Sequence, residues 1–242
     1  MTYVDGFVIA VPTANKQQFI AHAEKFDAML IEAGALRIVE AWGADLPRGK
    51  QTDFHGAVAA KDDETVCFSW VEWPDRTTRD AVHSRMEQMM QDGSMDGDPH
   101  DMPFDGARMI FGGFEAIVEE GAWTSGAYVQ GFVLPATDRE AYRKLAADAW
   151  KMFAGYGALQ VVECWQDDVP HGKQTDFHRA VKAEDGESIV FSWMLWPSRE
   201  VCDAAAEKMQ SDDSMQMPDV MPFNPQRMIF GGFVPVVDLE GE

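Results

Sequence analysis

The heptapeptide Gly49-Lys50-Gln51-Thr52-Asp53-Phe54-His55 recurs letter for letter as Gly172-Lys173-Gln174-Thr175-Asp176-Phe177-His178. Around both copies the chain also repeats the frames Glu-X-Trp, Asp-X-Pro and Phe-Ser-Trp in the same order. A repeat of about 120 residues is large enough to have a hydrophobic core of its own. We therefore divide the chain into repeat 1 (residues 1–120), a linker (121–127) and repeat 2 (128–242).

Each repeat shows the same order of expected elements. In repeat 1 the apolar periodicity predicts strands at 3–11, 35–42, 65–73 and 108–118, and helices at 13–33 and from 75 onward. The segment 52–60 is predicted to be extended, and a tight turn at 61–64 joins it to the next strand as a hairpin. This order of strands and helices is that of the ferredoxin-like α+β fold.

The expected strands are apolar on both faces, as in Tyr3 to Val11. The helices of a ferredoxin-like unit cover only one face of its sheet, so the other face needs a partner. The second repeat supplies that partner. We predict an α+β fold in which two ferredoxin-like repeats pack sheet to sheet as a pseudo-dimeric α/β barrel within one chain. Further oligomerisation is left open.

The charge balance narrows the class of partner. The chain of 242 residues has 20 Lys and Arg against 41 Asp and Glu, for a formal net charge of −21. Nucleic acids and anionic membranes attract basic surfaces, so we expect neither as a partner. The three cysteines form no CxxC pair, and no signal-like or membrane-spanning apolar run occurs. We therefore predict a cytoplasmic protein with a small-molecule ligand.

The pairs Asp53/His55 and Asp176/His178 are the first candidate catalytic groups. On an extended segment, side chains two residues apart lie on the same face. The carboxylate then fixes the tautomer of the imidazole and raises its basicity, as a general base requires. The alternative is structural: the aspartate caps a turn and the histidine bonds a loop carbonyl.

Glu40 and Glu163 are the second candidates, because each is an acid among apolar residues on one strand face. If they point into the space between the sheets, desolvation raises their pKa and makes them acid–base groups near neutrality. The alternative is a salt bridge to the lysine of the heptapeptide. The residues expected to contact a substrate are Lys50, Lys173, Trp42 and Trp165.

We predict no metal site and no cofactor. Glu40, Asp53 and His55 are ligand types that suit iron or manganese, but no characteristic spacing identifies them as a site. Lys50 follows a glycine, yet the glycine spacing of a phosphate-binding loop is absent.

The chain resembles the DUF1428 family of unknown function, the YbaA-like proteins. The resemblance lies in Tyr3-Val4-Asp5-Gly6-Phe7, Glu163-Cys164-Trp165, Asp168-Val169-Pro170, Gly172-Lys173, Phe191-Ser192-Trp193 and Arg227-Met228-Ile229-Phe230-Gly231-Gly232-Phe233. It covers nearly all of both repeats, whereas members are usually a single copy. It implies the dimeric α/β-barrel superfamily, which includes cofactor-free monooxygenases, haem-degrading enzymes, isomerases and lyases. It implies no particular activity.

Two functions from different classes follow. The first is a cofactor-independent small-molecule enzyme or ligand-binding protein that uses the cleft between the sheets. The second is a structural or assembly protein in which the repeated heptapeptide only stabilises the fold. Whether the chain is an enzyme is left open at this point.

Overall fold

The computed structural model describes residues 2–94, 102–211 and 221–241. Repeat 1 contains, in chain order, β1 (Tyr3–Pro12), the short 3-10 helix η1 (Thr13–Asn15), α1 (Lys16–Glu32), β2 (Arg37–Asp45), α2 (Phe54–Ala57), β3 (Glu64–Trp73), α3 (Arg76–Asp92) and β4 (Ile110–Gly121). Repeat 2 contains β5 (Tyr128–Ala136), α4 (Arg139–Gly155), β6 (Gln160–Asp168), α5 (Phe177–Ala180), β7 (Ser188–Trp196), α6 (Arg199–Ser211), η2 (Pro225–Arg227) and β8 (Ile229–Glu240).

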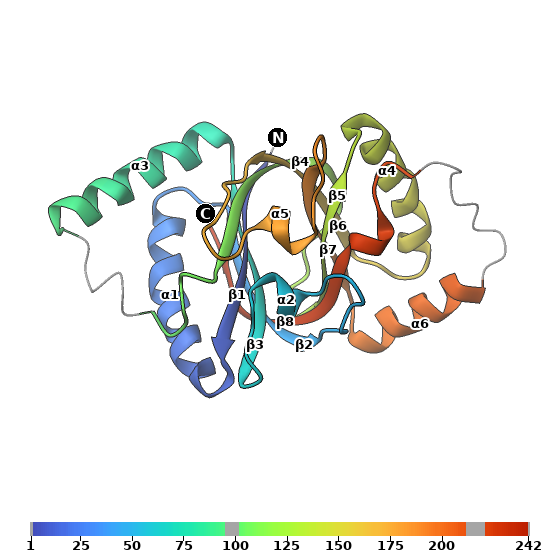
Figure 1. Ribbon diagram of the computed structural model, residues 1–242, viewed down its shortest axis with the longest axis horizontal. Helices are drawn as coiled ribbons and strands as arrows, with labels where there is room; N and C mark the ends of the chain where they lie inside the picture. The colour runs from blue at the N-terminus through green and yellow to red at the C-terminus, as the bar shows by residue number, and fades with distance from the viewer. Residues whose placement is uncertain (1, 95–101, 212–220, 242) are drawn as a thin grey trace.

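The eight strands form one closed antiparallel barrel in the order β1-β3-β2-β8-β5-β7-β6-β4. Within each repeat the strand order is that of a ferredoxin-like sheet, and the pairs β2–β8 and β4–β6 join the two repeats. Figure 1 shows α1 and α3 on one side of the barrel and α4 and α6 on the other. The predicted pseudo-dimeric α/β barrel is confirmed. None of the described helices is both long and apolar enough to cross a membrane.

The interior of the barrel is filled by aromatic side chains from both repeats. The rings of Phe68 and Phe191 stack with their centroids 4.4 Å apart, and those of Trp70 and Trp193 do the same at 4.4 Å. All four side chains are fully buried. The cleft expected between the sheets is therefore occupied by a close-packed core.

The predicted extended segment 52–60 is wrong in its central part, which forms the short helix α2. Asp53 is the N-cap of this helix: its carboxylate accepts hydrogen bonds from the backbone N–H of Gly56 at 2.7 Å and of Gly49 at 3.1 Å. Asp176 caps α5 in the same way. An aspartate that bonds the backbone locally favours a capped turn over an extended chain. The heptapeptide is thus a closed loop held by its own aspartate.

The glycine of the heptapeptide is required by this closed loop. A Cβ atom on Gly49 would lie 1.8 Å from the carbonyl oxygen of Thr52, and one on Gly172 would lie 2.0 Å from that of Thr175. The Thr175 hydroxyl also donates to the carbonyl of Arg108 in the other repeat at 2.9 Å. The two short helices contact each other in the middle of the molecule.

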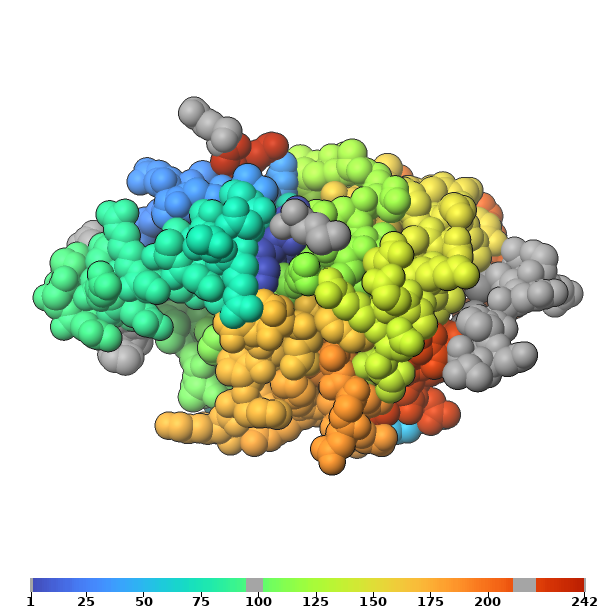
Figure 2. Space-filling view, turned by 90° about the horizontal axis from the view of Figure 1, so that it is seen from above, coloured from blue at the N-terminus to red at the C-terminus, as the bar shows by residue number. Residues whose placement is uncertain are grey.

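Ion pairs reinforce the contact between the repeats where β6 ends. Arg79 on α3 is buried, and its guanidinium bonds Asp5 at 2.8 Å and Asp168 of repeat 2 at 2.9 Å. Arg76 pairs with Asp167 at 2.7 Å. In Figure 2 the teal segment at the start of α3 lies directly beside the golden segment that ends β6. Charge-assisted contacts of this kind fix the register of the repeats.

Candidate functional site

Glu40 lies on the outer, helix-covered face of the sheet. Its neighbours Val39 and Ala41 point into the barrel core, so the alternation along β2 places Glu40 on the side of α1. The sequence-based expectation that Glu40 points between the sheets is therefore corrected. Both faces of this strand are apolar, which is why the pattern could not tell inside from outside.

The motifs Glu-X-Trp and Phe-Ser-Trp meet on this outer face. Glu40 is the register partner of Ser69 across β2 and β3, and the Ser69 hydroxyl donates a hydrogen bond to the Glu40 carboxylate. In repeat 2, Glu163 stands opposite Ser192 in the same register. Each serine lies between an inward phenylalanine and an inward tryptophan. The two repeats thus build the same carboxyl–hydroxyl pair under their first helix.

A second carboxyl group joins Glu40 in repeat 1. Asp27 on α1 is only 4% exposed, and its Oδ2 atom has no hydrogen-bond partner among the described residues. Burial, and next the charge of Glu40, raise the pKa of Asp27 to about 9. Burial raises the pKa of Glu40 to about 7, against the opposing effect of the Ser69 hydrogen bond. The pair therefore retains a proton at neutral pH, and its titration belongs to both groups together.

In repeat 2 the equivalent glutamate has a different hydrogen-bond partner from the helix above it. The phenolic oxygen of Tyr142 on α4 donates to Oε2 of Glu163 at 2.7 Å. Burial raises the pKa of Glu163 to about 7, while the hydrogen bonds from Tyr142 and Ser192 lower it. The helix position equivalent to Asp27 is Trp150. The two sites are consequently not equivalent, because one has a second carboxyl group and the other a phenol.

An aromatic cluster lies on the same outer face of the sheet as Glu40. Trp42 is on the same face of β2, with the Lys16 ammonium 5.0 Å from its ring centroid. Phe19 packs between Trp42 and Phe104, at centroid distances of 6.0 and 6.1 Å. On the flank of α1 beside this cluster is a pocket of about 320 Å³, which is lined by Asn15, Gln18, His22, Met102 and Pro103. Its volume falls in the range of small-molecule sites.

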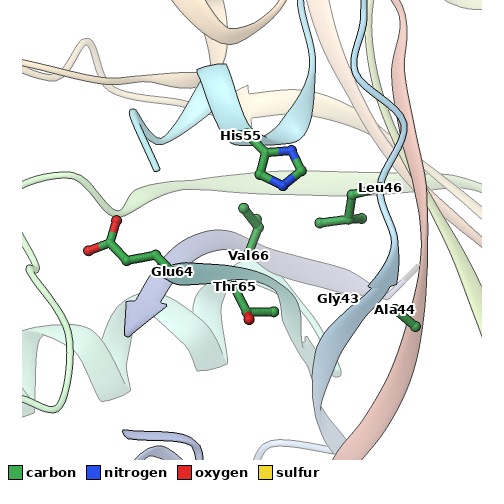
Figure 3. A pocket seen from close by; sticks show the side chains of 7 residues that line it. All are labelled: Gly43, Ala44, Leu46, His55, Glu64, Thr65 and Val66. Atoms are coloured by element: carbon green, nitrogen blue, oxygen red, sulfur yellow. The ribbon is translucent and has the colours of Figure 1, made fainter. Parts of the chain in front are cut away.

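His55 lies at the end of the barrel, apart from the Glu40 site. It lines a pocket of about 220 Å³ with Gly43, Ala44, Leu46, Glu64, Thr65 and Val66. Figure 3 shows its ring above the side chains of Val66 and Leu46, with Glu64 directed away. Burial and the charge of Arg48 lower the pKa of His55, and Asp53 opposes them. The imidazole is therefore neutral at pH 7, but this pocket is smaller than most ligand sites.

His178 has a different environment from His55. Its Nε2 atom lies 3.2 Å from the amide nitrogen of Gln166, and its ring centroid lies 4.3 Å from that of His171. Burial, and then His171, lower its pKa, while Asp176 raises it. In both repeats the aspartate of the heptapeptide is engaged in capping, and no hydrogen bond joins it to the histidine within the described ranges. The expected Asp–His pairs are thus not formed as hydrogen-bonded pairs.

The other predicted contact residues are divided between these regions. Trp165 packs on Tyr142 at a centroid distance of 6.2 Å, in the helix-covered site of repeat 2. Lys50 and Lys173 are exposed in the heptapeptide loops. No ion pair between either lysine and Glu40 or Glu163 occurs in the part of the chain that is described. The predicted set therefore falls into an outer site under each first helix and a loop region at the barrel end.

The model of the family described as "Protein of unknown function (DUF1428)" matches residues 2–106 and 127–225. The chain belongs to this family. The uncharacterized protein YbaA of Escherichia coli K12 and that of Shigella flexneri are each 54% identical over 114 residues, which is 46% of this chain and 97% of YbaA. The crystal structure of an anthrone oxidase-like protein aligns with a TM-score of 0.52 and 11% identity, over 99% of this chain and 93% of that chain. At this identity the likeness shows the shared fold alone.

Sequence reasoning missed Asp27, Tyr142 and His171. Asp27 follows the buried Ala23 by four residues and precedes Leu30 by three, so it lies on the apolar stripe of its helix. An acid at such a position is a signal that could have identified it. Tyr142 lies on the apolar stripe of its own helix, where the pattern says nothing of its hydroxyl. His171 lies outside the repeated heptapeptide, so the repeat does not point to it.

Proposed function

We propose that the protein is a small-molecule enzyme that transfers protons through the Asp27–Glu40 carboxyl pair under α1. The observation that carries the proposal is the unpartnered Oδ2 of Asp27, buried beside a second carboxyl group. A buried polar group without a partner destabilises the fold, and a like-charged neighbour destabilises it further. Buried ionisable groups that destabilise the fold and have no hydrogen-bond partner are typical of functional sites.

The roles within the pair follow from its protonation. Near pH 7 the pair takes up or releases one proton while it keeps the other, because its two titration steps lie at about pH 7 and about pH 9. Ser69 donates to Glu40 and so holds its carboxylate in one orientation. The unpartnered oxygen of Asp27 is suited to bond a hydroxyl group. The substrate class is therefore a small uncharged molecule with a hydroxyl or another acidic proton, which the aromatic surroundings would cover.

Access to the pair runs along α1. The 320 Å³ pocket on its flank is separated from the Glu40 face by Phe19 and Phe104, which contact each other and extend to Trp42. Phe104 belongs to the connection that precedes β4, rather than to a strand or helix. A shift of the Phe104 side chain would open the pocket toward the Glu40 face. This route gives Trp42 a role as one wall of the substrate site.

A structural role for the heptapeptide is the second candidate function. Capping by Asp53 and Asp176, and the close approach at both glycines, favour it. On this view the loops close one end of the barrel, and Lys50 and Lys173 keep it soluble. The role of His55 and His178 in acid–base chemistry stays a prediction, since neither is bonded to its aspartate.

Fragment binding tests the proposal even though the substrate is unidentified. A library of neutral phenols, alcohols and enolisable ketones is screened by ligand-observed NMR against the wild type and against Glu40→Gln and Asp27→Asn. Glu163→Gln is the matched control, because it makes the same change at the equivalent position of repeat 2. We expect fragments that bind the wild type and the control but lose at least tenfold in affinity with either repeat 1 variant.

Two outcomes of the fragment screen would contradict the proposed site. If folded Glu40→Gln and Asp27→Asn bind every fragment as the wild type does, the Asp27–Glu40 pair is not a substrate site. If only Glu163→Gln loses binding, the site belongs to repeat 2 and the assignment to repeat 1 is wrong.

A further inference from the structure

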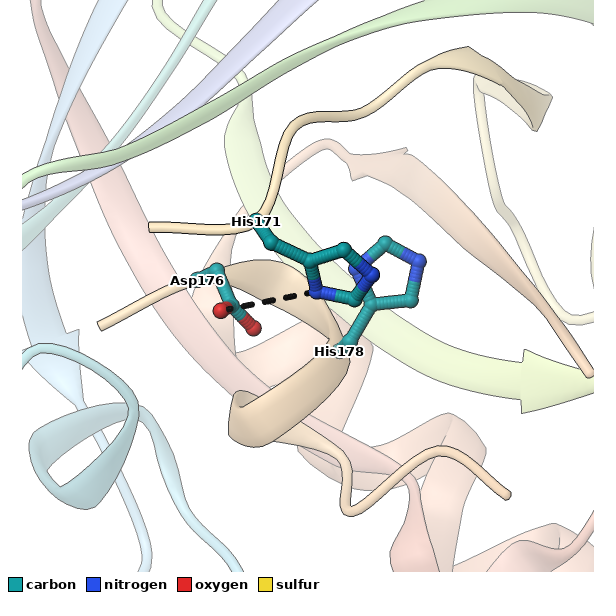
Figure 4. A group of neighbouring side chains, drawn as sticks. All are labelled: His171, Asp176 and His178. Carbon is teal, nitrogen blue, oxygen red and sulfur yellow. Dashed lines mark ion pairs between the residues drawn. The ribbon is translucent and has the colours of Figure 1, made fainter. Parts of the chain in front are cut away.

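Three potential metal ligands meet where the loop after β6 enters α5 of repeat 2. His171, Asp176 and His178 each offer one ligand atom, and these atoms lie within 4.8 Å of one another. Nδ1 of His171 is 3.9 Å from the Asp176 carboxylate, and the planes of the two imidazole rings are tilted by 33° to each other. Figure 4 shows both rings on the same side of the short helix, next to the carboxylate.

We propose that repeat 2 binds a divalent transition-metal ion, with Zn²⁺ the best match, between His171, Asp176 and His178. Two imidazoles and one carboxylate are a ligand set that suits zinc, and three protein ligands leave a coordination position for water. The ligand atoms must move closer by up to about 1.5 Å to reach ordinary zinc geometry. His171 is exposed and can make this movement by a change of rotamer.

A buried nitrogen of His178 is available to a metal ion at the site. Nδ1 of His178 is buried and has no hydrogen-bond partner among the residues described, which is uncommon for a buried polar atom. Nδ1 of His55 in repeat 1 is in the same condition, so the feature that distinguishes repeat 2 is the second imidazole, which His171 supplies. A metal ion bound at this nitrogen would supply the missing partner. This site is separate from the Asp27–Glu40 pair, so the proposal does not depend on the proposed function.

Two contacts oppose metal binding and make the proposal testable. The Arg179 guanidinium bonds Asp176 at 3.1 Å and must turn away, which its exposed position allows. The Gln166 carbonyl oxygen accepts from the backbone N–H of Ile189 at 2.7 Å, so its amide N–H₂ faces Nε2 of His178. With a metal on Nδ1, Nε2 carries the ring proton and needs an acceptor there. Gln166→Glu would provide that acceptor and still bond Ile189.

Repeat 1 provides a natural control for the same geometry. Arg48 occupies the position of His171, while Asp53 and His55 are retained. Gly56 stands in place of Arg179, so the competing guanidinium is absent there. The substitution Arg48→His therefore completes a second site of the same three ligands. His171→Arg makes the reverse change and introduces a residue that the equivalent loop already accommodates.

The experiment is titration of the tag-free, chelator-treated full chain with Zn²⁺ by calorimetry. We expect one equivalent for the wild type, and at least tenfold weaker binding for His171→Arg. Gln166→Glu should bind at least threefold more tightly, and Arg48→His should raise the stoichiometry from one to two. Circular dichroism confirms that each variant is folded.

The proposal is overturned if the wild type binds no Zn²⁺ at up to 100-fold excess, or if His171→Arg binds as tightly as the wild type. Weaker binding by Gln166→Glu would also contradict it, because an added carboxylate that accepts from His178 should strengthen the ligand. None of these outcomes depends on fragment binding at Glu40.

Discussion

The substitution Asp27→Asn should stabilise the protein at neutral pH. Asp27 has an ordinary pKa of 3.8, which burial and the charge of Glu40 raise to about 9 in the folded chain. At pH 7 the unfolded chain carries this group ionised, whereas the folded chain carries it protonated, so folding takes up a proton. Asparagine has a similar shape and needs no proton, so the substitution removes this penalty.

The magnitude follows from the difference between pH 7 and the ordinary pKa. Each pH unit above that value costs the folded state about 1.4 kcal/mol, so the penalty at pH 7 is about 4 kcal/mol as an upper limit. A group with a raised folded pKa contributes stability that is complete below its unfolded pKa. That stability is lost as the pH rises toward the folded value. The advantage of Asp27→Asn should therefore be small at pH 4 and grow toward pH 9.

The assay is urea denaturation, followed by tryptophan fluorescence, at pH values from 4 to 9. With rising pH, the free energy of unfolding of the wild type should fall relative to that of Asp27→Asn. The slope should reach at most about 1.4 kcal/mol per pH unit, which corresponds to one proton released on unfolding. Glu24→Gln is the matched control, since it removes an exposed acid from the same helix and should leave the pH dependence unchanged. A raised pKa of Asp27 is contradicted if Asp27→Asn lowers stability at pH 7 and its stability varies with pH in parallel with that of the wild type.

Three further predictions concern the other repeat and the heptapeptide. Gly172→Ala should destabilise the chain by about 2 kcal/mol in urea denaturation, because the new Cβ would collide with a loop carbonyl; unchanged stability would show that the loop relaxes freely. Tyr142→Phe should cost about 1 kcal/mol and raise the pKa of Glu163 further in an NMR titration, since a hydrogen bond that lowers it is lost. His55→Ala combined with His178→Ala should leave fragment binding at the α1 site unchanged; a loss comparable to that of the Glu40→Gln variant would restore histidine as the acid–base group.

The fold was predictable because the repeat is visible and the strands are apolar on both faces. Two-sided apolar strands require a cover on each side, and the second repeat was the available one. The same property concealed the direction of Glu40, because alternation identifies the two faces of a strand without saying which lies inside the barrel. The inward face becomes clear only in the structure, where Phe68 stacks on Phe191 and Trp70 on Trp193 inside the barrel.

The site was less predictable because its members come from separate elements. Asp27 reaches Glu40 from a helix, and nothing in the local sequence links the two. The heptapeptide stands out because it is repeated, yet its aspartate is a helix cap. An aspartate that hydrogen-bonds the nearby backbone is not available to pair with the histidine two residues later. The capped turn also separates the aspartate and histidine side chains.

The most direct measurement is an NMR titration of the side-chain carboxyl carbons of Asp27 and Glu40 in the full chain. We predict that the pair titrates with apparent pKa values of about 7 and about 9, and that Glu40→Gln lowers the pKa of Asp27 by removing its charged neighbour. If both carboxyl groups titrate near pH 4, the pair holds no proton at neutral pH, and proton transfer through Asp27 and Glu40 is contradicted.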